Sequence, residues 1–442
     1  MAGIPLIRHN DPAGTFAWRG GEPIPVSQFL AEVAQLAASL PERSHILNLC
    51  TDRYRFAVGF AAALVCGQTS LLPPNYTADF VARLARRYSG LYCLTDGTTE
   101  LSGIEIVPFP ASFTGTAPGA MPQIDEQRQA ALVFTSGSTG DPVAHPKTWG
   151  SLCRGAVAEA QRLGIVPDSG MAVLGTVPAQ HMYGLESSML LAMQNGLALV
   201  AERPFYPSDI CARLESLPRP RCLITTPVHL RTLLAEAAQL PPVDFVLCAT
   251  APLAPQLAAE AEARFGAPLH EIYGCTEAGM VASRRTTEGQ AWHLLPGVQM
   301  EQDADGTRVH GGHVEIEAPL SDVIERNPDG AFILHGRTAD MVNIAGKRTS
   351  LASLNHHLNA IAGVQDGVFL MPEDGDGTVT RPLAFVVAPG MNAQKILDAL
   401  RNSVDAVFLP RPLYFVDALP RNTTGKLTRE SLLRLRDECS KK

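Results

Sequence analysis

The hydrophobic positions in the first third of the chain follow two alternating spacings. Apolar residues between positions 26 and 40 recur every three or four residues, which predicts one buried helical face with Ser27 as its N-cap. Short continuous apolar runs at 45–50, 69–72 and 91–95 predict buried strands. Helical patterns at 55–66 and 78–88 lie between these runs. Strands and helices therefore alternate here.

The same alternation resumes after residue 130. A helix is expected over 148–163, and strands are expected at 131–134, 197–200, 221–226, 245–249 and 269–273. Strands that alternate with helices favour parallel sheets covered on both faces. We therefore expect an α/β fold whose large N-terminal domain is built of helix-covered, mostly parallel sheets.

The pattern changes near residue 281. From there to about residue 337 the chain shows short strands separated by Gly and Pro turns, such as Gly311-Gly312 and Asp329-Gly330. The remainder resembles a separate small α+β unit. The sequence thus predicts a large domain over 1–337, with a β-rich part at about 281–337, and a small mobile C-terminal lid over 338–442.

Composition and charge narrow the class of protein. The chain has 442 residues, of which 46% are hydrophobic, so it can fill a core and global disorder is excluded. Its net charge of −8 does not favour binding to nucleic acid. The longest apolar run, Phe56–Gly67, is too short to span a membrane, so we expect no membrane span. Nine scattered cysteines and the absence of a signal-like start favour a reduced, cytoplasmic protein.

Residues 131–140 place a buried strand before six residues that are each a glycine or a hydroxyl carrier. Glycine lets backbone N–H groups turn toward one point and hydroxyls add donors, as a loop that holds a polyphosphate requires. An ordinary Ser/Gly turn is the alternative. The Gly-x-x-x-x-Gly-Lys phosphate loop is excluded, because Val143 and Ala144 follow where Lys and Ser or Thr are needed. The Gly-x-Ser-x-Gly elbow is excluded because Phe134 takes the place of its first glycine.

Residues 134–142 resemble the signature loop of the acyl-adenylate-forming (AMP-binding) enzymes, which include acyl- and aryl-CoA ligases, adenylation domains of peptide synthetases, and luciferases. The resemblance implies that ATP is bound by Thr135, Ser136, Gly137, Ser138, Thr139 and Gly140. The family usually has a lysine directly after the proline, where this chain has Val143. Charge neutralisation of the outer phosphates then falls to Lys147 or His145, or is weaker.

Tyr273-Gly274-Cys275-Thr276-Glu277 is similar to a second motif of this family. The resemblance implies that the Tyr273 ring packs beside adenine, that Thr276 binds the α-phosphate, and that Glu277 helps to hold magnesium. A carboxylate is a natural ligand for the hard cation that such transfers require. A lone glutamate in a turn is more often simply solvated.

Asp322 and Arg337 match the next pair of family positions, where an aspartate holds the ribose hydroxyls. One carboxylate can accept both hydroxyl protons of a cis-diol, although a lone aspartate is more often a turn or cap residue. Residues 337–346 resemble the hinge, with Asp340 matching one of two family aspartates and Ala339 replacing the usual pivot.

Residues 419–429 resemble the family's C-terminal Pro-x-x-x-x-Gly-Lys loop. In that resemblance Lys426 bridges the acid's carboxylate and the α-phosphate of ATP. A lysine suits this position because its ammonium is a movable charge on a long stem. A lysine without this context would be an ordinary solvent-exposed one.

The acid-binding pocket is expected to contain His181, Tyr183, Ala249 and Thr250. Residues 178–184 resemble the family's acid-pocket segment, although His181 could instead be a satisfied core histidine. Ala249 and Thr250 replace smaller residues and would narrow the slot. The pocket is therefore interpreted as compact, better suited to an aromatic or short acid than to a long fatty chain.

The resemblance implies an AMP-forming acid–thiol ligase that uses ATP and Mg²⁺. A small carboxylic acid becomes an acyl-adenylate and is then transferred to the pantetheine thiol of CoA or of an acyl carrier protein. The lid carries 13 Lys and Arg against 11 Asp and Glu, and its cations are spread out apart from Lys347-Arg348. A spread pattern favours a carrier protein, which is steered by wide charged surfaces, unless these are plain solvated charges.

Other functions remain open. One is a CoA ligase for a fatty or other aliphatic acid, and another is an enzyme that forms the adenylate without a thioester. A non-catalytic nucleotide-binding relative is the third, because Val143 and Ala339 replace usual residues.

Overall fold

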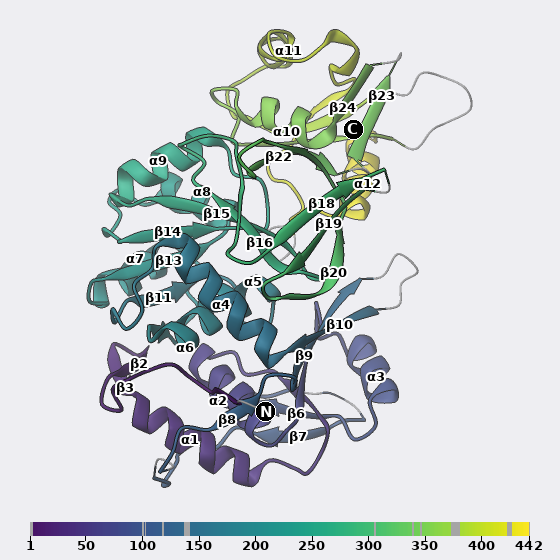
Figure 1. Cartoon of the computed structure of the whole chain (residues 1–442). Coiled ribbons are helices and arrows are strands. Elements are labelled where there is room, and N and C mark those ends of the chain that lie inside the picture. The colour runs from purple at the N-terminus through teal and green to yellow at the C-terminus, as the bar shows by residue number, and fades with distance from the viewer. Residues whose placement is uncertain are drawn as a thin grey trace.

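The computed structural model describes residues 3–99, 101, 103–116, 119–136, 142–304, 306–337, 340–344, 347–372, 381–421 and 427–441. Two helix-covered sheets form the body, and a small C-terminal unit lies against one end of it (Figure 1). The expected α/β class is confirmed.

The first sheet has six strands in the order β10-β9-β5-β4-β6-β7. Its strands are β4 (His45–Asn48), β5 (Thr69–Leu72), β6 (Tyr92–Thr95), β7 (Glu105–Pro108), β9 (Gln129–Ser136) and β10 (Pro142–Thr148). Its helices are α1 (Val26–Ser39), α2 (Arg53–Val65) and α3 (Ala78–Arg87). Neighbours pair in parallel, except that β10 folds back on β9 as an antiparallel hairpin. The hairpin carries the segment rich in Ser and Gly.

From Phe56 to its end, helix α2 contains only apolar residues and glycine, and this part packs between the two sheets. It contacts β4 and β5 of the first sheet and β12 (Ala198–Val200) of the second. Phe56 and Phe60 are fully buried. The opposite face of the first sheet is covered by α3, whose Leu84 packs with Leu47 and Leu71. The segment predicted as a buried helix thus lies at the centre of the body.

The second sheet has nine strands in the order β17-β16-β15-β14-β13-β11-β12-β2-β3. The other strands are β2 (Thr15–Arg19), β3 (Glu22–Pro25), β11 (Ala172–Gly175), β13 (Arg221–Thr225), β14 (Phe245–Cys248), β15 (Leu269–Cys275), β16 (Gly279–Arg284) and β17 (His293–Leu294). The helices are α4 (Trp149–Leu163), α5 (Met182–Gly184), the π-helix η1 (Leu185–Leu190), α6 (Leu191–Asn195), α7 (Pro207–Ser216), α8 (Pro227–Glu236) and α9 (Pro255–Phe265). One hydrophobic cluster joins α7, α8 and α9 to one face of this sheet. The parallel strands β13, β14 and β15 therefore end at a common edge, where polar side chains can meet.

The β-rich part forms two small sheets beyond β17. One contains β18 (Gln299–Asp303), β19 (Gly306–Gly311) and β20 (Val314–Leu320), and the other contains β21 (Asp322–Arg326) and β22 (Phe332–Arg337). Gly311, Gly312 and Gly330 have positive φ, as the predicted turns require. A short pair, β1 (Gly3–Pro5) with β8 (Gln123–Asp125), lies apart from both large sheets.

The C-terminal unit has its own hydrophobic clusters. It contains β23 (Met341–Ile344), β24 (Lys347–Ser350), α10 (Leu351–Asn359), β25 (Asp366–Leu370), β26 (Leu383–Val387), α11 (Ala393–Arg401), the 3₁₀-helix η3 (Ala406–Phe408), β27 (Leu413–Phe415) and α12 (Arg429–Cys439). Helix α10 packs on β22 of the large domain. A domain boundary at residue 338 remains our proposal, and we keep the name lid for this unit.

The start of α1 differs from the sequence expectation. Ser27 is not the N-cap of α1; Pro25 stands there without a side-chain cap, because the helix follows β3 directly and the Val26 amide bonds to the Gly14 carbonyl. Among the described residues no helix has the length and apolar character needed to cross a membrane.

Candidate functional site

In the β9–β10 hairpin, Thr135 lies opposite Val143, near the end of β9. The hydroxyl of Thr135 lies 2.9 Å from Nε2 of His145 on the facing strand. Of the predicted phosphate loop, Thr135 and the backbone of Ser136 are described, whereas Gly137, Ser138, Thr139 and Gly140 lie outside the described residues. Strand β9 thus continues through Thr135 to Ser136, two residues beyond the strand expected at 131–134.

The tight turn between β15 and β16 carries Thr276 and Glu277. Its closeness requires glycine at position 274, because a Cβ there would lie 2.3 Å from the carbonyl oxygen of Gly279. Thr276 is half-buried and Glu277 is exposed. The turn brings Glu277 against the hairpin, where its carboxylate lies 3.7 Å from Nε2 of His145.

Lys147 supports the turn between β15 and β16 through a hydrogen bond to its backbone. Its buried ammonium donates a hydrogen bond of 2.7 Å to the backbone carbonyl of Glu277. Burial lowers the pKa of Lys147, while Glu186 nearby raises it. Val143, at the position of the family's usual lysine, is 49% exposed. The two cationic candidates thus have different places, with Lys147 under the backbone of Glu277 and His145 beside its carboxylate.

Tyr273 and Asp322 come together, as the motif resemblance implies. The phenol of Tyr273 donates a hydrogen bond of 2.6 Å to Oδ2 of Asp322. The Tyr273 ring packs at 5.7 Å from Trp292 and 6.0 Å from Phe332, centroid to centroid. Asp322 faces Arg337 across the β21–β22 pair, so the predicted spacing between them is that of a hairpin register.

The predicted acid pocket lies at the ends of β13 and β14. The buried phenol of Tyr183 bonds to the carbonyls of Thr225 and Leu247, at 3.1 and 3.0 Å. Ala249 and Thr250 follow directly after β14, and Thr250 has a φ of +83°, which β-branched residues rarely adopt. The pocket wall therefore includes a strained residue of the kind often found at binding sites.

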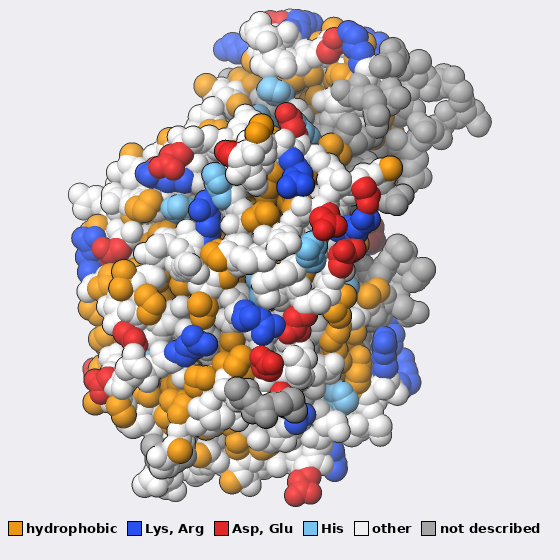
Figure 2. Space-filling model, viewed as in Figure 1, with side chains coloured by type: hydrophobic (Ala, Val, Ile, Leu, Met, Phe, Trp, Pro, Cys, Tyr) orange, Lys and Arg blue, Asp and Glu red, His pale blue; other side chains and the backbone are white. Residues whose placement is uncertain are grey.

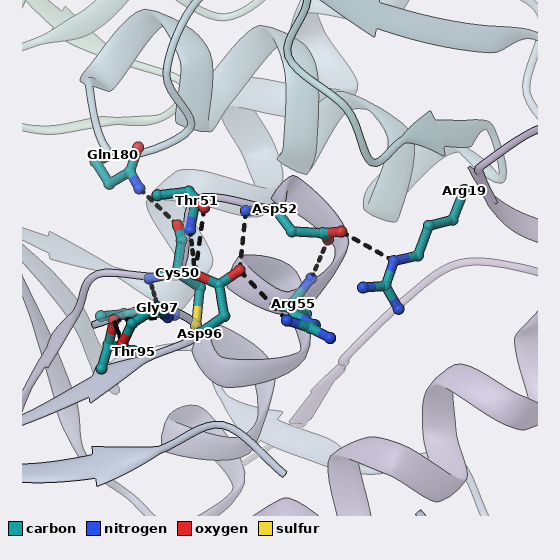
Figure 3. Close-up of polar contacts among 10 residues, drawn as sticks. Arg19, Cys50, Thr51, Asp52, Arg55, Thr95, Asp96, Gly97 and Gln180 are labelled. Atoms are coloured by element: carbon teal, nitrogen blue, oxygen red, sulfur yellow. Dashed lines mark hydrogen bonds and ion pairs between the residues drawn. The ribbon is translucent and has the colours of Figure 1, made fainter. Parts of the chain in front are cut away.

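His181 lies in the segment 178–184, whose backbone folds back closely on itself. A Cβ at Gly184 would lie 1.9 Å from the carbonyl oxygen of Pro178, so the chain can fold back here only with glycine. Gln180 donates a 2.9 Å hydrogen bond to the carbonyl of Cys50 at the end of β4. The segment before His181 is thus tied to the first sheet (Figure 3).

The anchor for this tie is a polar network at the carboxyl edge of the first sheet (Figure 3). The Asp96 carboxylate accepts the backbone amides of Thr51 and Asp52, at 2.9 and 3.1 Å. Asp52 caps α2 through the Arg55 amide and pairs with Arg19 at 2.9 Å. The network fixes the loop that receives Gln180.

A cavity of about 210 Å³ lies beside Glu277. Its polar lining includes His145, Lys147, Glu186, Glu277, His313 and Glu315. None of the four predicted acid-pocket residues lines it, although Met182 does. The cavity therefore borders the predicted magnesium ligand and is distinct from the predicted acid pocket.

Besides the four loop residues, two further predicted site residues lie outside the described part of the chain, namely Lys426 and the hinge residue Ala339. Asp340 is half-buried, and Arg337 is described by its backbone alone. The base of the Lys426 segment is described, since Arg421 and Leu427 form an antiparallel bridge.

The donor set fits a magnesium ion that is held mainly through substrate phosphates. Among the described residues no group of three or more His, Cys, Asp and Glu side chains could form a metal cage. Magnesium is often bound by one or two carboxylates together with phosphate oxygens. Glu277, exposed beside Thr276, supplies such a carboxylate.

Sequence reasoning missed the residues that support the site. Asp96, Gln180 and Trp292 carry no motif, because their roles depend on contacts between segments far apart in the chain. Lys147 could be named as a candidate only because the usual lysine was missing.

Comparison with known proteins agrees with this geometry. A family model described as AMP-binding enzyme matches residues 92–307. The 4-coumarate–CoA ligase of Rhodobacter capsulatus is 31% identical over 301 residues, which cover 67% of this chain and 74% of that protein.

Two solved structures share the fold over nearly the whole chain. ATP-bound MatB from Rhodopseudomonas palustris has a TM-score of 0.83 at 18% identity, covering 99% of this chain and 100% of that one. The o-succinylbenzoate CoA synthetase MenE of Bacillus subtilis, with its acyl-adenylate intermediate, has a TM-score of 0.80 at 20% identity, covering 96% of each chain. Motifs, fold and relatives agree that this chain belongs to the AMP-binding, acyl-adenylate-forming family of enzymes.

Proposed function

We propose that this enzyme activates an aromatic carboxylic acid with ATP and transfers the acyl group to CoA. The observation that carries the proposal is the convergence of two motifs on one edge of the body. Tyr273 contacts Asp322, while Glu277 from the adjoining turn contacts the phosphate-loop hairpin. A nucleoside and its phosphates can be held along this edge.

In the first step the substrate carboxylate attacks the α-phosphorus of ATP, and pyrophosphate leaves. Asp322 accepts the ribose hydroxyls, the Tyr273 ring packs beside the base, and Thr276 donates to the α-phosphate. Glu277 would hold magnesium, which would supply positive charge to the phosphates. Thr135, Ser136, Gly137, Ser138, Thr139 and Gly140 surround the outer phosphates. Lys426 stabilises the charge that develops between carboxylate and phosphate.

In the second step the thiolate of CoA attacks the acyl carbonyl, and AMP leaves. The adenylate is itself the activated species, so no protein nucleophile is required. Rotation of the lid about Ala339 and Asp340 would convert the site from the arrangement used in the first step to that used in the second.

The proposed substrate class rests on the pocket wall and on the relatives. Ala249 is buried, and Thr250 adds a branched side chain at a position where the backbone is strained. A flat ring fits a slot narrowed in this way better than a flexible alkyl chain. Two relatives are named for aromatic acids, 4-coumarate and o-succinylbenzoate.

CoA is proposed as the acceptor because several cations of the lid are paired with carboxylates of the lid itself. Four of them form ion pairs with lid carboxylates: Lys347 with Asp405, Arg401 with Asp398, Arg434 with Glu430, and Arg436 with Asp437. On the visible face of the lid, basic side chains likewise stand beside acidic ones (Figure 2). A carrier protein would need a wider uncompensated basic strip. The preference for a carrier protein that the sequence alone suggests therefore gains no support.

Acid-dependent exchange of labelled pyrophosphate into ATP tests the first step. A panel of hydroxybenzoic, hydroxycinnamic, short aliphatic and long fatty acids should give exchange with the aromatic members. Exchange with fatty acids alone would reverse the proposed substrate class, and no exchange with any acid would favour a non-catalytic relative.

The acceptor is tested with the best acid of that panel. The preformed acyl-adenylate is offered to CoA and, separately, to a holo acyl carrier protein. We expect a higher kcat/KM with CoA. A higher value with the carrier protein would overturn the CoA assignment, and transfer to neither would point to an enzyme that stops at the adenylate.

A further inference from the structure

An ion pair crosses from the large domain to the lid at Asp366. This residue begins β25, and its carboxylate oxygen Oδ2 lies 3.3 Å from Nη1 of Arg231 on α8. The side chains of Asp366 and Arg231 are 14% and 28% exposed. The contact is therefore largely shielded from water, where an ion pair is screened less than at the open surface.

The same carboxylate binds a second arginine within the lid. Arg421 donates from Nε to Oδ2 at 3.0 Å and from Nη2 to Oδ1 at 2.9 Å, which is a two-pronged arrangement. Such paired contacts fix orientation as well as charge. Arg421 in turn is bridged to Leu427, the residue after Lys426. A continuous path of contacts thus runs from α8 through Asp366 to the base of the lysine segment.

The two arginines play different parts. Arg421 and Asp366 both belong to the lid, so their contact moves with the lid if it rotates. Arg231 belongs to α8, which starts directly after β13, at the end where Tyr183 is anchored to Thr225. The contact with Arg231 is therefore the part that a rotation of the lid would break.

We propose that Arg231 and Asp366 are positioning residues that hold the lid in the orientation used for acid activation. The inference rests on the proposed function, because it gives Lys426 its part in the first step. In this orientation the described base of the lysine segment, at Arg421 and Leu427, is linked to α8 through Asp366. Release of Arg231 frees the lid for the second step.

The two half-reactions measured separately test this role. Arg231→Met should lower pyrophosphate exchange by about fivefold, because one shielded ion pair no longer favours the productive orientation. Transfer from supplied acyl-adenylate to CoA should stay unchanged or become faster. Arg231→Lys should restore most of the exchange, since it keeps the charge.

The matched control is Asp398→Asn, which removes a carboxylate from an exposed ion pair on α11 of the same lid. Equal behaviour of Arg231→Met and this control in both half-reactions would overturn the proposal. So would an equal loss of both half-reactions in Arg231→Met, because that pattern indicates a general structural defect.

Amide hydrogen exchange gives a readout that does not depend on catalysis. Arg231→Met should speed exchange in peptides that cover α8 and the start of β25, whereas Asp398→Asn should not. If the wild type activates no acid, the proposed function fails while this measurement still tests the contact. If amide hydrogen exchange in Arg231→Met is the same as in the wild type, the contact does not determine the position of the lid.

Discussion

At the scale of single residues, the contact between Tyr273 and Asp322 leads to a test of whether Asp322 binds the ribose of ATP. Asp322→Ala should raise the KM for ATP by about tenfold while leaving the KM for the acid nearly unchanged, because a charged hydrogen-bond acceptor is lost. Steady-state kinetics with ATP and 2′-deoxy-ATP measure both effects. The wild type should prefer ATP, and the variant should discriminate less.

Tyr273→Phe provides the matched control for this prediction. It removes the 2.6 Å hydrogen bond to Asp322 but keeps the ring that packs on Trp292 and Phe332. Its effect on the KM for ATP should be smaller than that of Asp322→Ala. Equal discrimination between the two nucleotides in wild type and Asp322→Ala would refute the ribose-binding role.

Lys147 lies under the backbone of Glu277 rather than at position 143, where the family usually has a lysine. Its ammonium fixes the carbonyl of Glu277, so Lys147→Met should lower pyrophosphate exchange by about tenfold and raise the magnesium concentration needed for half-maximal rate. A magnesium titration of the exchange rate measures both. The exposed Lys395 on α11 serves as control, as Lys395→Met. An unchanged magnesium requirement in Lys147→Met would contradict the role.

At the scale of elements, the hydrophobic pattern predicted helices α1 to α4 and the strands β4, β5, β6, β9, β12, β13, β14 and β15, but not β7, β10, β11, β16 and β17. The segment 69–72 matches β5, and 148–163 differs from α4 by one residue. Buried parallel strands and amphipathic helices carry their signal within a few residues. The hairpin of β2 and β3 was missed, because its stability comes from pairing with β12, about 180 residues away. The π-helix η1 was also missed, since nothing local separates its pattern from that of an α-helix.

The candidate site likewise has residues that the sequence could predict and contacts that it could not. Tyr273, Glu277 and Asp322 could be predicted because short motifs hold them, and their contacts with one another and with the hairpin agree with those motifs. The tie from Gln180 to Cys50 and the ion pair at Asp366 join distant segments, so no local pattern indicates them. The roles assigned to these side chains remain predictions.

Helix α4 carries a carboxyl group that links stability to pH. Glu159 is fully buried, and burial raises its pKa to about 8; the neighbouring Glu186, also buried, has a pKa raised to about 7. Between about pH 4.5 and 8 the folded chain keeps a proton that the unfolded chain has lost. The contribution of these two carboxyl groups to the free energy of unfolding should therefore fall as pH rises through this window, by up to about 1.4 kcal/mol per unit for each group.

Urea unfolding at several pH values checks this expectation. Glu159→Gln should make the decline shallower, most clearly between pH 7 and 8, where Glu186 no longer contributes. Glu236→Gln, at an exposed position on α8, should leave the slope as in the wild type. A Glu159→Gln variant whose slope equals that of the wild type would contradict the buried, protonated state of Glu159.

At the scale of the whole molecule, the lid should matter for one half-reaction more than for the other. Lys426→Ala should lower pyrophosphate exchange by about a hundredfold, as expected when one well-placed charge is lost from a transition state. Transfer of the acyl group from supplied acyl-adenylate to CoA should remain largely intact. Exchange within about twofold of wild type, far less than such a charge contributes, would remove Lys426 from the proposed mechanism.

The position of β2 within the nine-stranded sheet has a consequence for synthesis on the ribosome. Ala17 pairs with Leu199, so the first hairpin of the chain cannot join its sheet until about 180 further residues have been made. The last strand of the first sheet ends at Thr148, so this sheet can assemble while β2 and β3 are still unpaired with β12. The hairpin of β2 and β3 is thus translated well before its partner strand, and the apolar side chains of β2 lack their native neighbours in the interval.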